Sequence, residues 1–406
     1  MSRLRSGATR ALLIPFLLLS GCEDPGSTPV APPVVQCEDA SVLKPPRFSI
    51  THHKGAVRVK GRAAALPNTQ WAKGDSVLAF FGGKDFKVVF TLNLRMYLAE
   101  YKGGQPTVTV ISQDDEGLSK SIGSINSPLF SPDGKKIVFA GTTRGKPAFV
   151  QEVPGGETEG WRMLVDPKAP RVRTTADPHW HVEGGRTYIY FSTLSGLVNY
   201  TPNCGQVAGA TYRAEVTGDT TMGPFEVTGI PGAYRGGISK DGQWAGTSYA
   251  SSALFDRARD TTLLLAGGEQ QCNPSMNPYP AGSRRSDYMM ILAFGETPYN
   301  LVTGKTFLEG RHENLWIYNR NDRIVWQARR PDETLYVKWE KPEWSTHPDF
   351  ATAVAIKATE DGDLYAVRIG DLSAAEEDTV HQARGYLKIA EGGFNSDSYS
   401  HLWVAE

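Results

Sequence analysis

The sequence predicts an all-β fold, a single β-propeller built from repeated four-stranded sheets called blades. A strand–turn–strand pattern recurs along the chain at intervals on the order of 40 to 70 residues, which is typical of propeller blades around a channel. The 406 residues include 42 glycines and 10% aromatic residues, which suits short strands joined by tight turns. Few windows show the apolar spacing of an amphipathic helix. The alternative is an irregular pair of β-sandwiches.

The clearest copy of the repeat covers residues 125–141, INSPLFSPDGKKIVFAG. An extended segment leads into a turn at Pro132-Asp133-Gly134, and a strand follows from Lys136 to Ala140. Asp caps local amides in such a turn and Gly accepts a positive φ. Six weaker copies predict strands at 76–81, 187–192, 243–249, 287–294, 350–356 and 399–404.

Seven lead-in segments are therefore visible, and the sequence predicts six or seven blades, with seven preferred. The strand at 399–404 is expected to form the inner strand of a last blade, completed by N-terminal strands at 48–51 and 56–60. Closure by both ends of the chain would remove an exposed sheet edge.

Residues 131–139, SPDGKKIVF, resemble the repeat of TolB-type propellers, also called the PD40 or WD40-like repeat. This resemblance implies six blades, against the count of seven. Residues 237–249, 271–278 and 343–350 resemble a paralogous family of lipoproteins from Fibrobacter. Neither resemblance implies a specific ligand.

The N-terminus predicts export. Residues 1–10 hold three arginines and no acidic residue, and a short apolar run follows at 11–19. The sequence Leu19-Ser20-Gly21-Cys22 resembles the lipobox of bacterial lipoproteins, which implies cleavage before Cys22 and lipidation of its thiol. We expect a signal peptide at 1–21, a lipidated Cys22 with a flexible tether at 22–46, and the propeller at 47–406. The alternative is an ordinary signal peptide cut nearby.

These features predict a protein of the bacterial cell envelope, lipid-anchored to the inner or the outer membrane, with its propeller in the periplasm or at the cell surface. The chain carries 43 basic and 44 acidic side chains, a net charge of −1. Balanced charge gives no strong field to recruit nucleic acid, so none is expected as a partner.

Three cysteines remain after Cys22, and an oxidising compartment allows one disulfide among them. Cys204 with Cys272 is the preferred pair because Cys37 lies in the tether. The alternative in which all three stay free remains open.

In a propeller the loops leading into the innermost strands meet at one mouth of the channel. We therefore expect one ligand-binding rim from separate repeats, formed by Gln70, Trp71, His179, Trp180, His181, Arg235, Asn273, Ser275, Trp344 and His347, and extended by His401. Aromatic faces beside amide, imidazole and guanidinium donors suit a sugar or a peptide segment. The alternative is that the tryptophans only pack neighbouring blades together.

His179 and His181 are two residues apart, so on a strand they face the same way and could share a metal ion. With His347 and His401 they would form a histidine-rich site, but two histidines are an incomplete ligand set, and we expect no metal and no cofactor. No nucleophile motif is present.

The sequence therefore favours a non-enzymatic binding or scaffolding platform for an envelope protein or a glycan. A metal-assisted lyase or hydrolase acting on carbohydrate at the propeller mouth is the first alternative. A structural component without a small ligand is the second.

Overall fold

A computed structural model provides the structure of the protein. It describes residues 48–51, 62–63, 66, 69–93, 95–111, 125–141, 148–152, 161–165, 175–193, 210–217, 223–224, 226–231, 234–248, 252–265, 272–279, 285–294, 311–370, 372 and 379–406. The predicted signal peptide, the tether with Cys22 and Cys37, Cys204 and the side chain of Cys272 lie outside this part of the chain.

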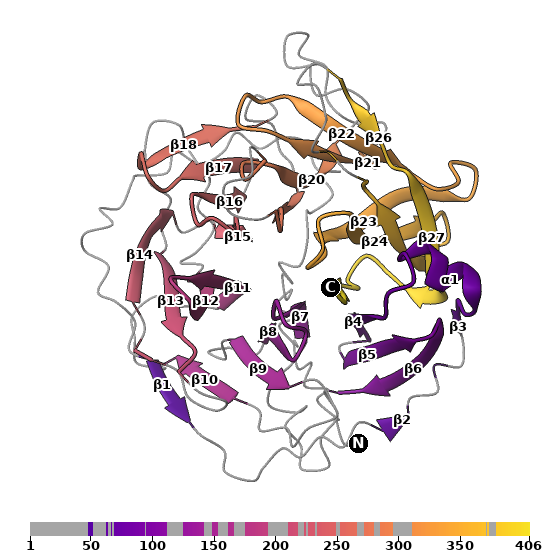
Figure 1. Ribbon diagram of the computed structural model, residues 1–406, viewed down its shortest axis with the longest axis horizontal. Coiled ribbons are helices and arrows are strands. Elements are labelled where there is room, and N and C mark those ends of the chain that lie inside the picture. The colour runs from indigo at the N-terminus through magenta and orange to yellow at the C-terminus, as the bar shows by residue number, and fades with distance from the viewer. Residues whose placement is uncertain are drawn as a thin grey trace, which may run out of the picture.

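The described residues form six separate sheets arranged around a common centre (Figure 1). The strand of each sheet nearest the centre contacts the corresponding strands of both neighbouring sheets, so the contacts run around a closed ring. These inner strands are β7 (Ile125–Phe130), β11 (Thr175–Glu183), β15 (Tyr234–Ile238), β19 (Cys272–Met276), β23 (Tyr336–Trp344) and β28 (Ser400–Val404). The predicted all-β propeller is confirmed.

In the first five sheets, four strands follow one another in chain order from the inner strand outward. The first adds β8 (Lys136–Gly141), β9 (Ala148–Glu152), β10 (Trp161–Val165) and β1 (Phe48–Thr51). The second adds β12 (Arg186–Thr193), β13 (Ala210–Glu215) and β14 (Glu226–Pro231). The third adds β16 (Trp244–Ser248), β17 (Ser252–Asp256) and β18 (Thr261–Leu264).

The other three sheets, like the first with β1, recruit an extra outer strand from a distant part of the chain. The fourth adds β20 (Met289–Phe294), β21 (Arg311–Tyr318), β22 (Ile324–Arg329) and β26 (His381–Gln382). The fifth adds β24 (Phe350–Lys357), β25 (Gly362–Arg368), β27 (Gly385–Phe394) and β3 (Gln70–Trp71). The sixth adds β4 (Phe86–Leu92), β5 (Arg95–Lys102), β6 (Gln105–Val110) and β2 (Arg62–Ala63). The expectation of four strands per blade therefore holds for two of the six sheets, while four sheets have five.

The preference for seven blades is wrong because the segment expected to be a strand at 76–81 forms helix α1 (Asp75–Phe80) instead. Val77 and Phe81 are four residues apart, and both are buried on one side of this turn. The Phe81 ring lies 3.9 Å from the Phe86 ring and 4.9 Å from the Phe350 ring, between centroids. The helix thus covers the junction of the fifth and sixth sheets and starts no blade of its own.

The C-terminal strand closes the ring as predicted, but with different partners. β28 pairs with β4 over its whole length, from Ser400 opposite Phe90 to Val404 opposite Phe86. The expected partner at 48–51 is β1, which pairs with β10 of the first sheet, and 56–60 lies outside the described residues. The strands β4, β5 and β6 follow one another as hairpins, so only the innermost place of this sheet remains for β28.

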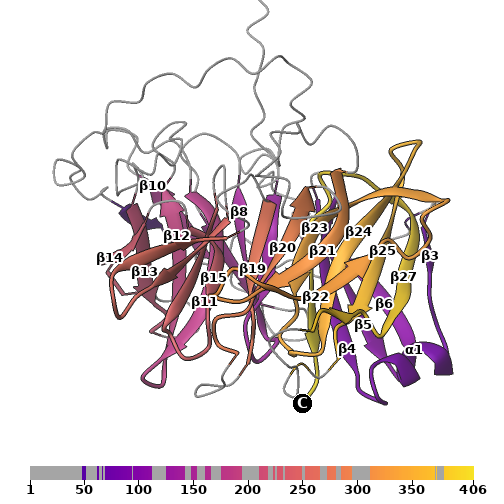
Figure 2. The ribbon, with the colours of Figure 1, turned by 90° about the horizontal axis from the view of Figure 1, so that it is seen from above.

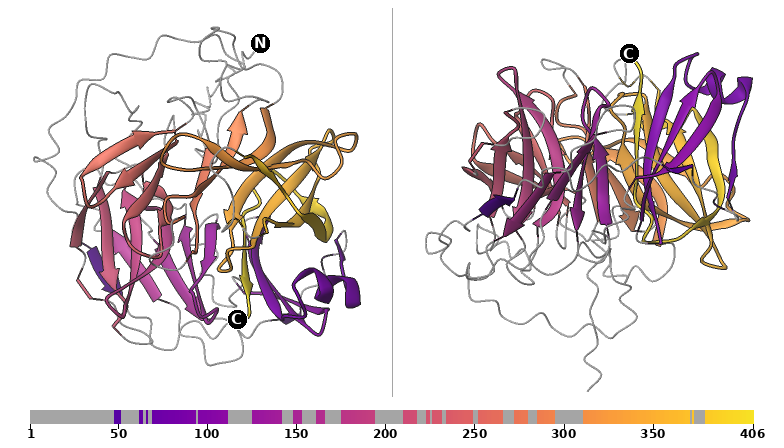
Figure 3. Two further views of the ribbon diagram at one scale, coloured as in Figure 1. Left: turned by 45° about the horizontal axis from the view of Figure 1, so that its top comes forward. Right: turned by 90° about the horizontal axis from the view of Figure 1, so that it is seen from below.

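The turn that carries the sequence repeat joins an inner strand to the next strand. Ser131 Oγ donates to Asp133 Oδ1 at 2.6 Å and accepts from the backbone N–H of Lys136 at 2.8 Å. The same bonds recur in the third sheet, where Ser239 replaces Ser131 and Asp241 replaces Asp133. The C-terminus and α1 lie on one face of the ring (Figures 2 and 3). The described residues contain no helix that could span a bilayer.

Candidate binding site at the centre of the ring

Four inner strands contain a polar residue followed by proline; β11 has Asp177-Pro178, and in the other three dipeptides the polar residue has a positive φ. These three dipeptides are Ser127-Pro128 in β7, Asn273-Pro274 in β19 and Lys341-Pro342 in β23. The polar residues have positive φ values of 48°, 48° and 47°, and the pairing register with the next strand shifts at each dipeptide. Proline has no N–H to give to a ladder, so it is tolerated at a bulge, and a bulge re-aims side chains. All three polar side chains consequently line the centre of the ring.

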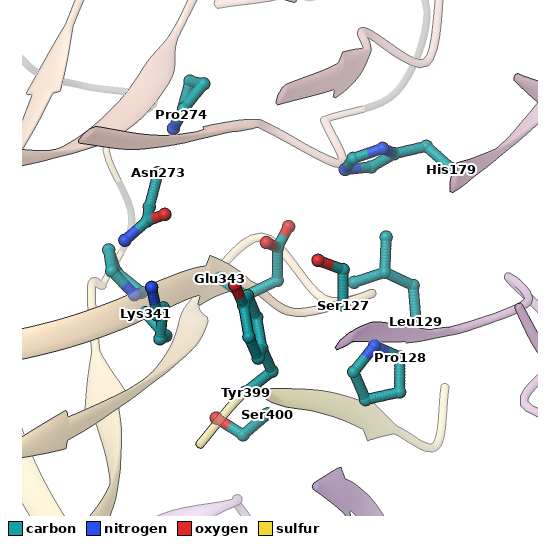
Figure 4. Close-up of a pocket in the computed structure, with 11 residues that line it drawn as sticks. Ser127, Pro128, Leu129, His179, Asn273, Pro274, Lys341, Glu343, Tyr399 and Ser400 are labelled. Carbon is teal, nitrogen blue, oxygen red and sulfur yellow. The ribbon is translucent and has the colours of Figure 1, made fainter. Parts of the chain in front are cut away.

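There they form what we call the central pocket, a space of about 550 Å³ that is partly open to solvent (Figure 4). Its residues come from five of the six inner strands and from the residue preceding β28. They are Ser127, Pro128, Leu129, His179, Asn273, Pro274, Lys341, Pro342, Glu343, Tyr399 and Ser400. Ring closure is thus what brings these distant segments together.

Lys341 supplies a buried cation to the pocket, with 4% of the residue exposed. Its Nζ lies 4.9 Å from the centroid of the Tyr399 ring, a cation–π contact. Burial acts to lower the pKa of Lys341, but Tyr399, Glu340 and Asp397 outweigh burial and raise the pKa above its ordinary value. The side chain is therefore charged at neutral pH.

Glu343 supplies a carboxylate that points into the space between Asn273 and Ser127 (Figure 4). Ser275 Oγ donates to Glu343 Oε1 at 2.6 Å and accepts from the backbone N–H of Trp344 at 2.9 Å. Ser275 belongs to the fourth sheet and Glu343 to the fifth, so one inter-blade hydrogen bond fixes the carboxylate.

Two histidines lie at and behind the wall of the pocket. The ring of His179 packs against Gly237, where a Cβ would come within 2.9 Å of its Cδ2 atom. Behind the wall, His401 Nδ1 accepts from the backbone N–H of Phe130 at 2.9 Å. Burial lowers the pKa of His401 to about 3, with His179 acting in the same direction, so this imidazole is neutral at neutral pH.

Of the residues expected at one rim, His179 and Asn273 line the central pocket. Ser275 is not a lining residue of the pocket, but its hydroxyl donates a hydrogen bond to the Glu343 carboxylate, which is one. Arg235 lies in β15, another inner strand, and its side chain is outside the described residues.

Gln70 and Trp71 do not lie at the centre, contrary to expectation. They form β3, the outermost strand of the fifth sheet, opposite Glu391 and Ala390 of β27. The Trp71 ring packs 5.5 Å from the Phe90 ring, between centroids. The lead-in pattern failed here because the segment that follows is helical, and the dipeptide instead pairs with a free sheet edge.

Two further tryptophans act as packing residues, which is the alternative that the sequence left open. Trp180 donates from Nε1 to the Leu129 carbonyl at 3.1 Å and joins the cluster between the first and second sheets. Trp344 is 2% exposed within the cluster between the fourth and fifth sheets, and its Nε1 donates to the Pro348 carbonyl at 2.9 Å.

His347 and His181 also lie away from the central pocket. His347 is half-buried in the turn after β23, and burial lowers its pKa. His181 is buried beside Tyr190 and Arg257; burial first, and then Arg257, lowers its pKa to about 4. Within the described part of the chain, no three His, Cys, Asp or Glu side chains are grouped to hold a metal ion, so His179 and His181 belong to no such group.

Sequence reasoning missed Lys341, Glu343 and Tyr399. The signal that could have found the first two is the recurring polar-residue–proline dipeptide, which aligns Lys341-Pro342 with Ser127-Pro128 and Asn273-Pro274. The lead-in expected at 344–349 instead covers the last residue of the inner strand β23 and the turn that follows it.

No protein-family model matches the chain, and no curated protein matches its sequence. Among solved structures, TolB from Acinetobacter baumannii is 12% identical at a TM-score of 0.46, over 79% of this chain and 67% of TolB. A protein assigned as TolB from Agrobacterium tumefaciens is 15% identical at a TM-score of 0.41, and the match covers 80% of this chain and 100% of that protein. Apo AztD from Citrobacter koseri is 7% identical at a TM-score of 0.40, and the match covers 80% of this chain and 99% of AztD.

TolB structures are thus among the neighbours of this chain. At these identities the propeller assignment rests on the chain's own sheet arrangement. The resemblance to Fibrobacter lipoproteins stays a prediction.

Proposed function

We propose that this chain is an envelope lipoprotein, anchored through Cys22, whose propeller is a binding platform that contacts a protein segment or a glycan at the central pocket. One observation carries the binding role: ring closure places the buried ammonium and the fixed carboxylate of β23 beside an amide of β19 around one space. Ligand sites characteristically combine such a hollow with a few convergent polar groups.

The electrostatics of the pocket favour binding over chemistry. The Lys341 charge is compensated by neighbouring acidic and aromatic groups, and the Glu343 carboxylate is held by Ser275. Fixed, compensated groups of this kind recognise a partner by geometry and hydrogen bonding.

The anchor is supported by the lipobox-like sequence at residues 19–22. Expression in a bacterial host with a radioactive fatty acid tests it. We expect the full chain to be labelled and to sediment with membranes. The Cys22→Ser variant should not be labelled and should not sediment with membranes. Labelling that persists in Cys22→Ser would contradict the lipidation site, while leaving the pocket unaffected.

Site-specific photo-cross-linking tests the binding site. A photoreactive amino acid replaces Asn273 in the pocket or, as the control, Val227, which is 55% exposed on the outer strand β14. The full chain in detergent is irradiated with an envelope fraction of its source. We expect adducts from position 273 that are absent from position 227. Identical adducts from both positions, or none from 273, would contradict the proposed site.

A further inference from the structure

The central pocket concentrates polar groups of both hydrogen-bonding kinds in a small space. Ser127, Asn273, Tyr399 and Ser400 can donate and accept, Lys341 donates, and Glu343 accepts. An extended peptide presents one amide N–H and one carbonyl about every 3.8 Å, whereas a sugar ring presents several hydroxyls around its edge. The density of polar groups therefore matches a sugar ring better than a peptide backbone.

The charges in the pocket disfavour an anionic ligand. Lys341 is a cation that an anion would contact, but the Glu343 carboxylate lines the same pocket. A carboxylate or phosphate seated at this ammonium would therefore lie in the field of the Glu343 carboxylate.

A cationic ligand is disfavoured by Lys341 itself. Its ammonium lines the same pocket as Glu343, so a second cation seated at the Glu343 carboxylate would lie in the field of the first. An uncharged ligand that donates hydrogen bonds to Glu343 escapes both penalties.

We propose that the central pocket binds one neutral sugar ring, with its hydroxyls donating to Glu343 and contacting Asn273. This inference rests on the proposed function and names the class of its ligand: an uncharged glycan unit. Ser275 acts as a positioning residue because it holds the Glu343 carboxylate from the neighbouring sheet.

Titration calorimetry with simple sugars tests the inference. The probes are the methyl glycosides of glucose, galactose and mannose and free N-acetylglucosamine, with glucuronate and glucosamine as charged comparators. The full chain is kept in a detergent without a sugar head group, which would otherwise compete. We expect at least one neutral sugar to bind, and more tightly than either charged comparator.

The decisive variant is Glu343→Gln, which keeps the size and the Oε1 acceptor but removes the charge. Hydrogen bonds to a charged group are the stronger ones, so we expect affinity to fall about tenfold or more. Glu391→Gln on β27, whose side chain is 52% exposed, is the matched control and should bind as the unaltered chain does. Circular dichroism and thermal unfolding establish that both variants are folded.

Three results would overturn the inference: no neutral sugar binds, a charged comparator binds best, or Glu343→Gln binds unchanged. If no sugar binds but cross-linking at position 273 still captures a protein, the sugar class is wrong and the proposed platform stands. If both experiments fail, the central pocket is not the binding site.

Discussion

The imidazole of His401 accepts a hydrogen bond from the backbone N–H of Phe130, 271 residues away in the chain. Phe130 is the last residue of β7, the strand at the inner edge of its sheet. Its N–H points towards His401 and away from the β7–β8 ladder. Unpaired backbone groups at a buried edge cost free energy, and His401 supplies the missing acceptor. One side chain of β28, the last strand, thus connects the sixth sheet to the first by a hydrogen bond. We call this contact the closure contact.

Acid should weaken this closure contact and lower the stability of the fold. The pKa of His401 is lowered to about 3 in the folded chain against an ordinary value of 6.5, mainly by burial. The unfolded state therefore binds more protons between these values, and folding stability is lost as the pH falls from about 6.5 towards 3. In His401→Asn, which keeps an acceptor without titrating, unfolding midpoints in urea should fall less steeply over this window. The same slope in both proteins would contradict the role of His401.

Gly134 should be intolerant of a side chain. Its φ is +67°, and an added Cβ would come within 2.5 Å of the Trp403 ring. Gly83 provides the control because its φ is +83° and nothing lies within 4 Å of its Cβ position. Both alanine variants carry the cost of left-handed backbone, about 1–2 kcal/mol, but Gly134→Ala adds a clash of about 1–3 kcal/mol. Equal free energies of unfolding for the two variants would mean that Trp403 does not pack on this turn.

Ser275 and Glu343 should be energetically coupled across two sheets. Ser275→Ala leaves the buried Trp344 N–H without its acceptor, which should cost about 1–3 kcal/mol in denaturant unfolding. The Ser275→Ala/Glu343→Gln double variant should cost less than the sum of the single changes because they share one hydrogen bond. Strict additivity would place these side chains out of contact.

The repeat and the closure of the ring could be predicted from sequence because both depend on local signals. The Ser-x-Asp-Gly turn at 131–134 specifies its own hydrogen bonds, and the same turn recurs at 239–242. The strand at 400–404 is apolar enough to identify an inner strand at the chain end.

The blade count and most of the central pocket could not be predicted, because each depends on tertiary context. The segment at 75–80 is short and apolar, and such a run forms a strand or a helix according to what it packs against. Only the ring brings the Lys341 ammonium over the aromatic ring of Tyr399, at 4.9 Å from its centroid. Gln70 and Trp71 become an outer strand only because β27 offers them an edge.

Ring closure is the relationship on which the central pocket depends, and hydrogen exchange at the Phe130 amide measures it most directly. If β28 sits against β7, this amide exchanges only on global unfolding in the unaltered chain. It should lose that protection in His401→Ala, while the Val138 amide within the same sheet keeps its own. Free exchange of Phe130 in the unaltered chain, or unchanged protection in His401→Ala, would contradict closure through this contact.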